Sequence, residues 1–243
     1  MRWKYIIIGI ALLLSGCLSS NQFLSMGGAN GTKDTLPVGV DSLLEMAEYC
    51  ERIYDKGKEI GDNEFAYNVV QDRGVTIISI RGTNNAKNVL TDLDARPFFD
   101  KKLGIQIHRG FRAAAEKLRN EIIEKYALEE HIILTGHSLG GAIAQIMGLW
   151  FEDDAYDVQI YTFGSPTVTT TDMGDEMHFR VYIEDDPVPF LPPFPYVHWG
   201  VRIDANTLEW AENHPVGEFT KIDGRDHSIK AYLKVLRRHN ENI

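Results

Sequence analysis

The chain has 243 residues, a length that fits one α/β-sized domain or two small ones. Its apolar content of 44% and charged content of 25% are those of a globular protein that can bury a large core. The 25 basic and 35 acidic residues give a formal net charge of −10, which argues against nucleic acid as a partner and against purely electrostatic docking on anionic lipid. Any membrane contact is therefore expected to be hydrophobic or covalent.

The N-terminus supplies a covalent route to a membrane. Arg2 and Lys4 precede a mostly apolar run over residues 5–14, which has about the length of a signal-peptide core and is too short to span a bilayer. The next segment, Leu14-Ser15-Gly16-Cys17, resembles the lipobox of bacterial lipoproteins. That resemblance implies cleavage before Cys17 and lipid on Cys17. An ordinary secretory signal or an uncleaved anchor is the alternative.

These features predict three regions. Residues 1–16 are expected to be a lipoprotein signal peptide, and residues 17–36, rich in Ser, Gly and Asn, a flexible tether. Residues 37–243 are expected to form one domain, held in the bacterial cell envelope by the lipid on Cys17 or, alternatively, secreted. Cys50 is the other cysteine and is expected to be a buried apolar residue without chemistry of its own.

Beyond Pro37 the chain alternates between helix-like and strand-like patterns. Apolar residues at helical spacing predict helices over residues 40–54, 111–126, 139–150 and 228–238. β-rich runs predict strands over residues 65–70, 75–80, 132–134, 158–163 and 179–183, with a hairpin joining the first two and a late hairpin over 196–203 and 207–210. This alternation predicts an α/β fold with a mainly parallel sheet and helices on both faces.

The most informative segment is Gly136-His137-Ser138-Leu139-Gly140, which joins an apolar strand to an apolar helix. A Gly-x-Ser-x-Gly sequence in this position is typical of a nucleophile elbow, where a serine sits on a strained turn. Ser138 is the predicted nucleophile. The helix start aims N–H groups at a developing oxyanion, and the N–H of Leu139 is one expected donor. An ordinary serine in a glycine-rich turn is the alternative.

A serine nucleophile needs a histidine base, and that base needs a carboxylate to orient it. In α/β-hydrolases the order along the chain is serine, acid, histidine. Asp185 and Asp186 both follow the predicted strand over residues 179–183. The histidines after them are His198, which lies in a strand-like run, and His214 and His227, which both fit the order.

Four ordered segments resemble the class 3 lipase family, the fungal-type lipases with an α/β-hydrolase fold. They are residues 80–83 (IRGT), 107–111 (IHRGF), 136–141 (GHSLGG) and 186–193 (DPVPFLPP). The resemblance covers about residues 40–235, and His227 before the terminal helix fits a fifth position. It implies Asp186 as the acid and His227 as the base.

The same resemblance implies roles upstream of Ser138. Thr83 matches the second oxyanion donor, residues 84–94 occupy the place of the family's lid, and Asp92 matches an aspartate that supports the oxyanion residue. Pro187 departs from the bulky aliphatic residue usual after the acid. The predicted lid is only mildly amphipathic. The sequence therefore does not decide whether the substrate is a lipid droplet or a soluble short-chain ester.

The sequence therefore predicts a serine hydrolase that cleaves carboxylic esters of lipids, triacylglycerol or related acyl esters, through an acyl-enzyme. A phospholipase or feruloyl-type esterase with the same triad is an alternative, as is a non-catalytic lipid-binding surface lipoprotein. No cofactor, metal site or obligate protein partner is expected, because the eight histidines lack zinc-site spacing and no phosphate or dinucleotide motif occurs. The expected partners are a lipid or small ester and a membrane.

Overall fold

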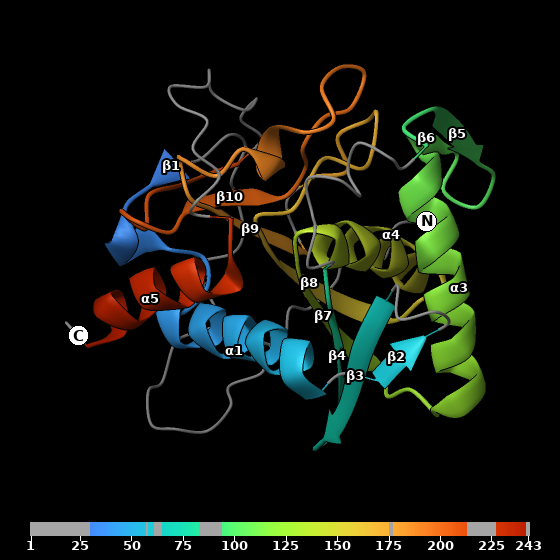
Figure 1. Ribbon diagram of the computed structural model, residues 1–243, viewed down its shortest axis with the longest axis horizontal. Coiled ribbons are helices and arrows are strands. Elements are labelled where there is room, and N and C mark those ends of the chain that lie inside the picture. Colours follow the sequence, from blue (N-terminus) through green and yellow to red (C-terminus); the bar gives the residue numbers. More distant parts are fainter. Residues whose placement is uncertain are drawn as a thin grey trace.

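A nine-stranded sheet forms the centre of the computed structural model, which describes residues 30–56, 58–60, 65–82, 94–174, 177–212 and 227–241 (Figure 1). The strand order is β1-β11-β10-β9-β8-β7-β4-β3-β2. The strand bounds are β1 (Asn30–Gly31), β2 (Lys58–Ile60), β3 (Phe65–Asp72), β4 (Val75–Ile80), β7 (His131–His137), β8 (Asp157–Phe163), β9 (His178–Tyr182), β10 (Val201–Asp204) and β11 (Trp210–Ala211). A separate hairpin consists of β5 (Pro97–Asp100) and β6 (Ile105–His108).

The five central strands, β4, β7, β8, β9 and β10, pair in parallel, and the flanking strands pair antiparallel. The prediction of a mainly parallel central sheet is therefore confirmed. Because neighbouring parallel strands point the same way, their carboxyl ends meet at one edge of the sheet. The turn after β7 and the loop after β9 start from that edge, and these carry Ser138 and Asp186.

Helices cover both faces of the sheet, as the sequence pattern predicted. Helices α1 (Val40–Lys56) and α5 (Ile229–Asn240) pack together on one face, and α3 (Arg109–Lys125) and α4 (Leu139–Asp153) on the other (Figure 1). Strand β7 serves both layers, since Ile132 and Leu134 join the core beneath α3 and α4 while Ile133 packs on the α1 and α5 side. The period of two along a strand produces this division. Helix α4 is buried on all sides from Leu139 to Phe151, which explains its nearly continuous apolar sequence.

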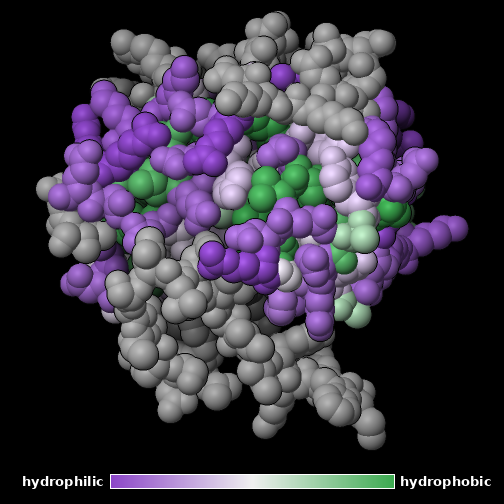
Figure 2. All heavy atoms as spheres, turned by 90° about the horizontal axis from the view of Figure 1, so that it is seen from below, coloured by the Kyte–Doolittle hydropathy of each residue, from purple (hydrophilic) through white to green (hydrophobic). Residues whose placement is uncertain are grey.

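The two predicted hairpins are present. Strands β3 and β4 pair through the turn at Asp72–Val75, and β10 pairs with β11, although residues 196–200 lie outside that strand. The hairpin of β5 and β6 was not anticipated, because its four-residue strands are too short for a clear pattern. Figure 2, viewed from below, shows mostly hydrophilic side chains with apolar ones between them over the described part of that face.

The structured domain begins earlier than the sequence indicated. Asn30 and Gly31, assigned to the tether, form β1 against Ala211 and Trp210, and a short 3-10 helix follows at Lys33–Thr35. Backbone pairing to a sheet edge needs no apolar side chain, so composition alone does not reveal it. Within the described ranges, no helix has the length and apolar character needed to cross a membrane.

Candidate active site

Ser138 occupies a strained turn between β7 and α4. Its φ is 58° and its ψ −130°, a left-handed conformation that non-glycine residues rarely adopt. A Cβ at Gly136 would overlap the backbone of Gly140, and one at Gly140 would overlap the carbonyl of Ile80. These glycines therefore let strand, turn and helix approach closely, and the geometry is that of a nucleophile elbow.

The structure brings Ser138, His227 and Asp186 into one hydrogen-bonded chain. The Ser138 Oγ lies 2.9 Å from His227 Nε2, and His227 Nδ1 lies 2.9 and 2.8 Å from the two carboxylate oxygens of Asp186. Ser138 and Asp186 are fully buried and the His227 side chain is 8% exposed. With a proton on Nδ1 directed at the carboxylate, Nε2 is free to accept the proton of the serine hydroxyl.

Each member is held by local structure. Asp186 lies in the loop after β9, where its Oδ1 accepts the backbone N–H of Val188 at 2.9 Å. His227 directly precedes Ser228, whose hydroxyl accepts the N–H of Ala231 and caps the start of α5. The cap fixes the place where α5 begins, and therefore where the His227 side chain enters the site.

Tyr232, which the sequence analysis did not single out, provides a further hydrogen bond to the Asp186 carboxylate. The Tyr232 hydroxyl, fully buried on α5, donates to Asp186 Oδ2 at 2.6 Å. Burial, and then the nearby Asp186 charge, raise the pKa of Tyr232 well above its usual value, so its hydroxyl stays protonated and donates. In the sequence Tyr232 shares its apolar helix stripe with Ile229, Leu233 and Leu236, which hides it among core residues.

A second imidazole lies against the first. The rings of His137 and His227 stack with centroids 4.7 Å apart and planes 28° apart. His137 Nδ1 lies 2.9 Å from the Tyr54 hydroxyl of α1. Burial, followed by repulsion from His227, holds the pKa of His137 well below its usual value, while burial raises that of Tyr54. A neutral His137 therefore accepts a hydrogen bond at Nδ1 from the Tyr54 hydroxyl, which stays protonated.

The rival residues lie elsewhere or outside the described residues. Asp185 is exposed beside the buried Asp186. His198 is buried with its Nε2 against the carbonyl of Pro189 rather than at the serine. His214 lies outside the described residues.

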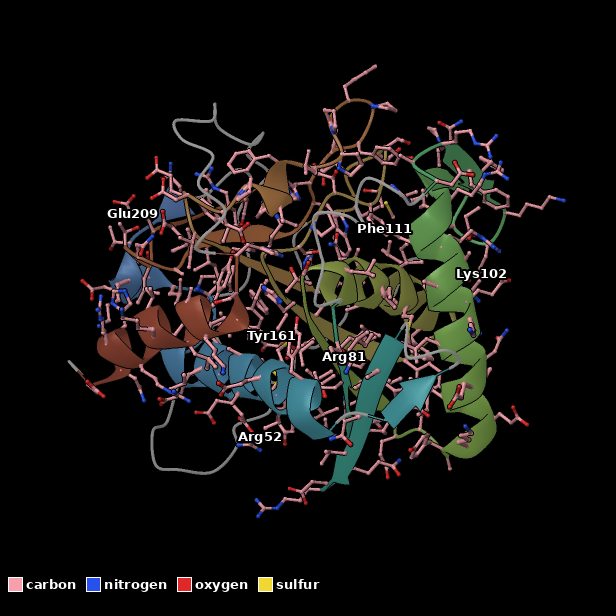
Figure 3. The ribbon with its side chains drawn as sticks, viewed as in Figure 1. Arg52, Arg81, Lys102, Phe111, Tyr161 and Glu209 are labelled. Carbon is pink, nitrogen blue, oxygen red and sulfur yellow. The ribbon has the colours of Figure 1, made fainter. Side chains whose placement is uncertain are left out.

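Of the remaining predicted residues, the structure describes Leu139 and Cys50. Leu139 is the first residue of α4, where backbone N–H groups have no intrahelical acceptor. Cys50 is fully buried, with its Sγ 3.2 Å from the Thr135 hydroxyl, as expected of a core residue. Thr83, Asp92 and Cys17 lie outside the described residues. Arg81, labelled in Figure 3, is described and follows the end of β4.

This arrangement suits acyl transfer by a serine. A buried hydroxyl, an imidazole and a carboxylate stand in line, and the start of a helix lies directly beside the hydroxyl. In the part of the chain with assigned positions, no cluster of three or more His, Cys, Asp or Glu has the geometry of a metal site.

A comparison with models of known protein families shows which family the chain belongs to. The family model described as "Lipase (class 3)" matches residues 77–196, from within β4 through Ser138 and Asp186 to Tyr196. The chain belongs to the class 3 lipase family. The predicted resemblance is thus confirmed for the family and its α/β-hydrolase fold.

Relatives of this class 3 lipase include proteins named as lipases. It is 31% identical over 167 residues to the secreted mono- and diacylglycerol lipase 1 of Fusarium solani, covering 61% of this chain and 49% of that one. It is 28% identical over 210 residues to a lipase of Rhizomucor miehei, covering 75% and 54%. The chain thus spans about half the length of each relative.

The solved triacylglyceride lipase of Rhizomucor miehei superposes with a TM-score of 0.60 at 18% identity, covering 85% of this chain and 96% of that one. The lipase of Rhizopus microsporus var. chinensis superposes with a TM-score of 0.56 at 18% identity, covering 84% and 85%. At this identity the likeness establishes the fold.

Proposed function

We propose that this class 3 lipase hydrolyses carboxylic esters of lipids, with acylglycerols as the substrate class. The observation that carries the proposal is the buried hydrogen-bonded chain from Ser138 through His227 to Asp186 on an elbow turn. Acylglycerols are favoured because the Fusarium solani relative is named a mono- and diacylglycerol lipase.

The reaction proceeds in two halves. In the first, Ser138 Oγ attacks the ester carbonyl while its proton passes to His227 Nε2, and the alcohol leaves with that proton. In the second, His227 takes a proton from water, the water oxygen attacks the acyl-enzyme, and the acid product leaves as Ser138 recovers its proton. Asp186 orients His227 and stabilises its positive charge in both halves.

Two residues are assigned as hydrogen-bond donors to the oxyanion, Leu139 through its N–H and Thr83 through its N–H and its hydroxyl. The N–H of Leu139 lies at the positive end of α4, and Thr83 supplies the second donor, with Asp92 supporting Thr83. Removing one oxyanion donor lowers kcat by about 10²–10³-fold in comparable enzymes. Thr83→Val, which deletes the hydroxyl, tests whether that group contributes: a fall in kcat with little change in KM supports it, and an unchanged kcat removes the hydroxyl from the site.

The activity is tested with p-nitrophenyl ester turnover by the native chain and by Ser138→Ala. We expect the variant to lose essentially all turnover while keeping its folded spectrum and melting behaviour. Turnover equal to that of the native chain would sink the assignment. A panel of acylglycerols, phospholipids and feruloyl esters then identifies the ester class, since the same triad serves all three.

The lipobox-like segment supports a second part of the proposal, that Cys17 carries lipid and tethers the folded domain to the cell-envelope membrane. Growth in the presence of an alkyne fatty acid tests this. Label on the native chain and its loss in Cys17→Ser are expected, with Cys50→Ser as the matched control that keeps the label. A native chain that takes up no label and is found in the medium would instead be a secreted protein.

A further inference from the structure

A buried histidine outside the triad, His198, closes the loop that follows Asp186. The Nε2 atom of His198 lies 2.5 Å from the carbonyl oxygen of Pro189, nine residues earlier in the chain. A carbonyl oxygen only accepts hydrogen bonds, so Nε2 carries a proton and donates it to this contact. The contact closes residues 189–198, which lie along the top of Figure 1 in orange and carry the 93% exposed Phe194.

The carbonyl that accepts this hydrogen bond belongs to a short 3-10 helix over Val188–Phe190. The first residue of that helix donates its backbone N–H to Asp186 Oδ1 at 2.9 Å. Val188 and Pro189 are consecutive residues, so a displacement of the Pro189 carbonyl also displaces the N–H that Asp186 accepts. One helical turn therefore connects the hydrogen bond from His198 to the carboxylate that orients His227.

The backbone on both sides of His198 is fixed to other parts of the domain. The Val197 N–H donates to the Thr169 carbonyl at 2.8 Å, and a β-bridge joins Thr169 to Ile107 of β6. On the other side, Trp199 is fully buried in the core beneath α3 and α4. Because the base of the ring is held in this way, Nε2 of His198 determines where the Pro189 carbonyl lies.

The surroundings of His198 keep its ring neutral. Burial, followed by the charge of Arg180 and by the nearby His178 and Arg202, holds the pKa of His198 well below its usual value. In a neutral ring with its proton on Nε2, the other nitrogen is an acceptor. Nδ1 of His198 has no hydrogen-bond partner among the described residues, so the Nε2 donor is the polar group of this ring that the described structure uses.

A second residue braces the same loop without contacting the Pro189 carbonyl. The Thr167 hydroxyl donates to the carbonyls of Leu191 and Pro192 at 3.1 and 2.8 Å. The backbone N–H of Thr167 donates to the Leu191 carbonyl as well, at 2.8 Å, and keeps that contact when the hydroxyl is removed. Thr167→Val therefore loosens the loop beyond the 3-10 helix and serves as the matched control for changes at His198.

We propose that His198 is a positioning residue for the triad: its Nε2–H holds the Pro189 carbonyl and thereby keeps the Asp186 carboxylate aligned with His227. The proposal rests on the proposed function, because the reaction that His198 serves is ester hydrolysis at Ser138. His198 touches no reacting atom. It supports the Asp186 oxygen Oδ1, through the Val188 N–H, whereas Tyr232 holds Oδ2 directly.

Two amide variants of the full chain separate the reach of the donor from its polarity. The amide nitrogen of His198→Gln stands about as far from the backbone as Nε2, whereas that of His198→Asn stands about where Nδ1 does and falls short of the Pro189 carbonyl. With p-nitrophenyl esters we expect kcat to stay within about two-fold in His198→Gln and to fall about ten-fold in His198→Asn, at unchanged KM, because misplaced catalytic groups cost up to about 10²-fold. Equal losses in both variants, no loss in His198→Asn, or a His198→Asn chain that does not fold would overturn the proposal.

Proton NMR reads the same alignment without substrate. The proton that His227 Nδ1 donates to the charged Asp186 takes part in a charge-assisted hydrogen bond and therefore resonates far downfield. We expect this resonance to be unchanged in His198→Gln and Thr167→Val, and to move upfield and exchange faster with water in His198→Asn. Equal shifts in Thr167→Val and His198→Asn would show that any loosening of the loop has the same effect, and would contradict a specific role of His198.

A double-mutant cycle with Tyr232→Phe tests whether the effect of His198 reaches Asp186. Residues that act on one carboxylate are coupled, so the loss of kcat/KM in the double variant should differ by more than about two-fold from the product of the single losses. A loss equal to that product would place the effect of His198 somewhere other than Asp186.

The two proposals fail in different ways. If the native chain hydrolysed no ester while the downfield resonance moved only in His198→Asn, the proposed function would be wrong and the positioning of Asp186 by His198 would stand. If Ser138→Ala lost turnover while both amide variants matched the native chain in kcat and in the resonance, the function would stand and the role of His198 would be wrong.

Discussion

Tyr232→Phe tests how the buried carboxylate is held. The substitution keeps the ring and deletes the hydroxyl that donates to Asp186 Oδ2 at 2.6 Å. A hydrogen bond to a charged group contributes about 1.5–3 kcal/mol, and Asp186 is fully buried, so water cannot replace the lost donor. The free energy of unfolding should fall by about that amount. With a urea m value of about 3 kcal/mol/M, the midpoint moves down by about 0.5–1 M.

The same variant should be a poorer catalyst. Asp186 stabilises the positive charge that develops on His227, and if about half of 3 kcal/mol is felt in the transition state, kcat/KM falls about ten-fold. Tyr161→Phe is the matched control, because its buried hydroxyl donates to the neutral Gln159 side chain at 3.2 Å. Its expected loss is about 0.5 kcal/mol, with unchanged turnover. Indistinguishable urea midpoints and kcat/KM values in the two variants would refute the reasoning.

Three further changes probe the surroundings of the triad and of α3. Gly164 has a φ of +55°, and a Cβ there would lie 2.6 Å from Asp186 Oδ2, so Gly164→Ala should lower kcat/KM by about 10²-fold; a loss below five-fold in ester turnover would contradict this. Tyr54→Phe leaves the buried His137 Nδ1 without its 2.9 Å partner and should cost about 1–3 kcal/mol of unfolding free energy, measured by urea titration, and no loss would disprove the pairing. Burial lowers the pKa of His108 from 6.5 to about 4, so the unfolded state binds more protons than the folded state between these pH values. The free energy of unfolding therefore decreases as the pH is lowered through this range, by up to about 1.4 kcal/mol per pH unit. His108→Asn, which keeps an oxygen at the start of α3, should flatten that slope in urea titrations at pH 7, 5 and 4, and an unchanged slope would count against this residue.

The sequence predicted the structure best where the local pattern of residues alone determines the geometry. The apolar run over residues 132–134, the elbow glycines and the nearly all-apolar α4 form a unit whose geometry follows from local sequence. The order of motifs along the chain then pointed to Asp186 and His227, which the structure places in hydrogen-bonding contact. The parallel central sheet followed from the alternation of strands and helices.

Other parts of the site depend on contacts between distant segments. Tyr232 and Tyr54 look like ordinary core aromatics in sequence, and only the packing of α5 and α1 against the sheet brings their hydroxyls to Asp186 and His137. Strand β1 pairs through its backbone, so its Asn and Gly gave no strand signal. The exposure of Phe194 was equally hidden, since a phenylalanine among prolines gives no indication of which way the loop faces.

The most direct test of the central claim is mass spectrometry of the chain after reaction with a fluorophosphonate. The account predicts one phosphonyl adduct on Ser138, formed at a rate that parallels the loss of ester turnover, and no adduct in Ser138→Ala. A native chain that stays unlabelled at Ser138 while hydrolysing esters, or an adduct on another serine that accounts for the loss of activity, would contradict it.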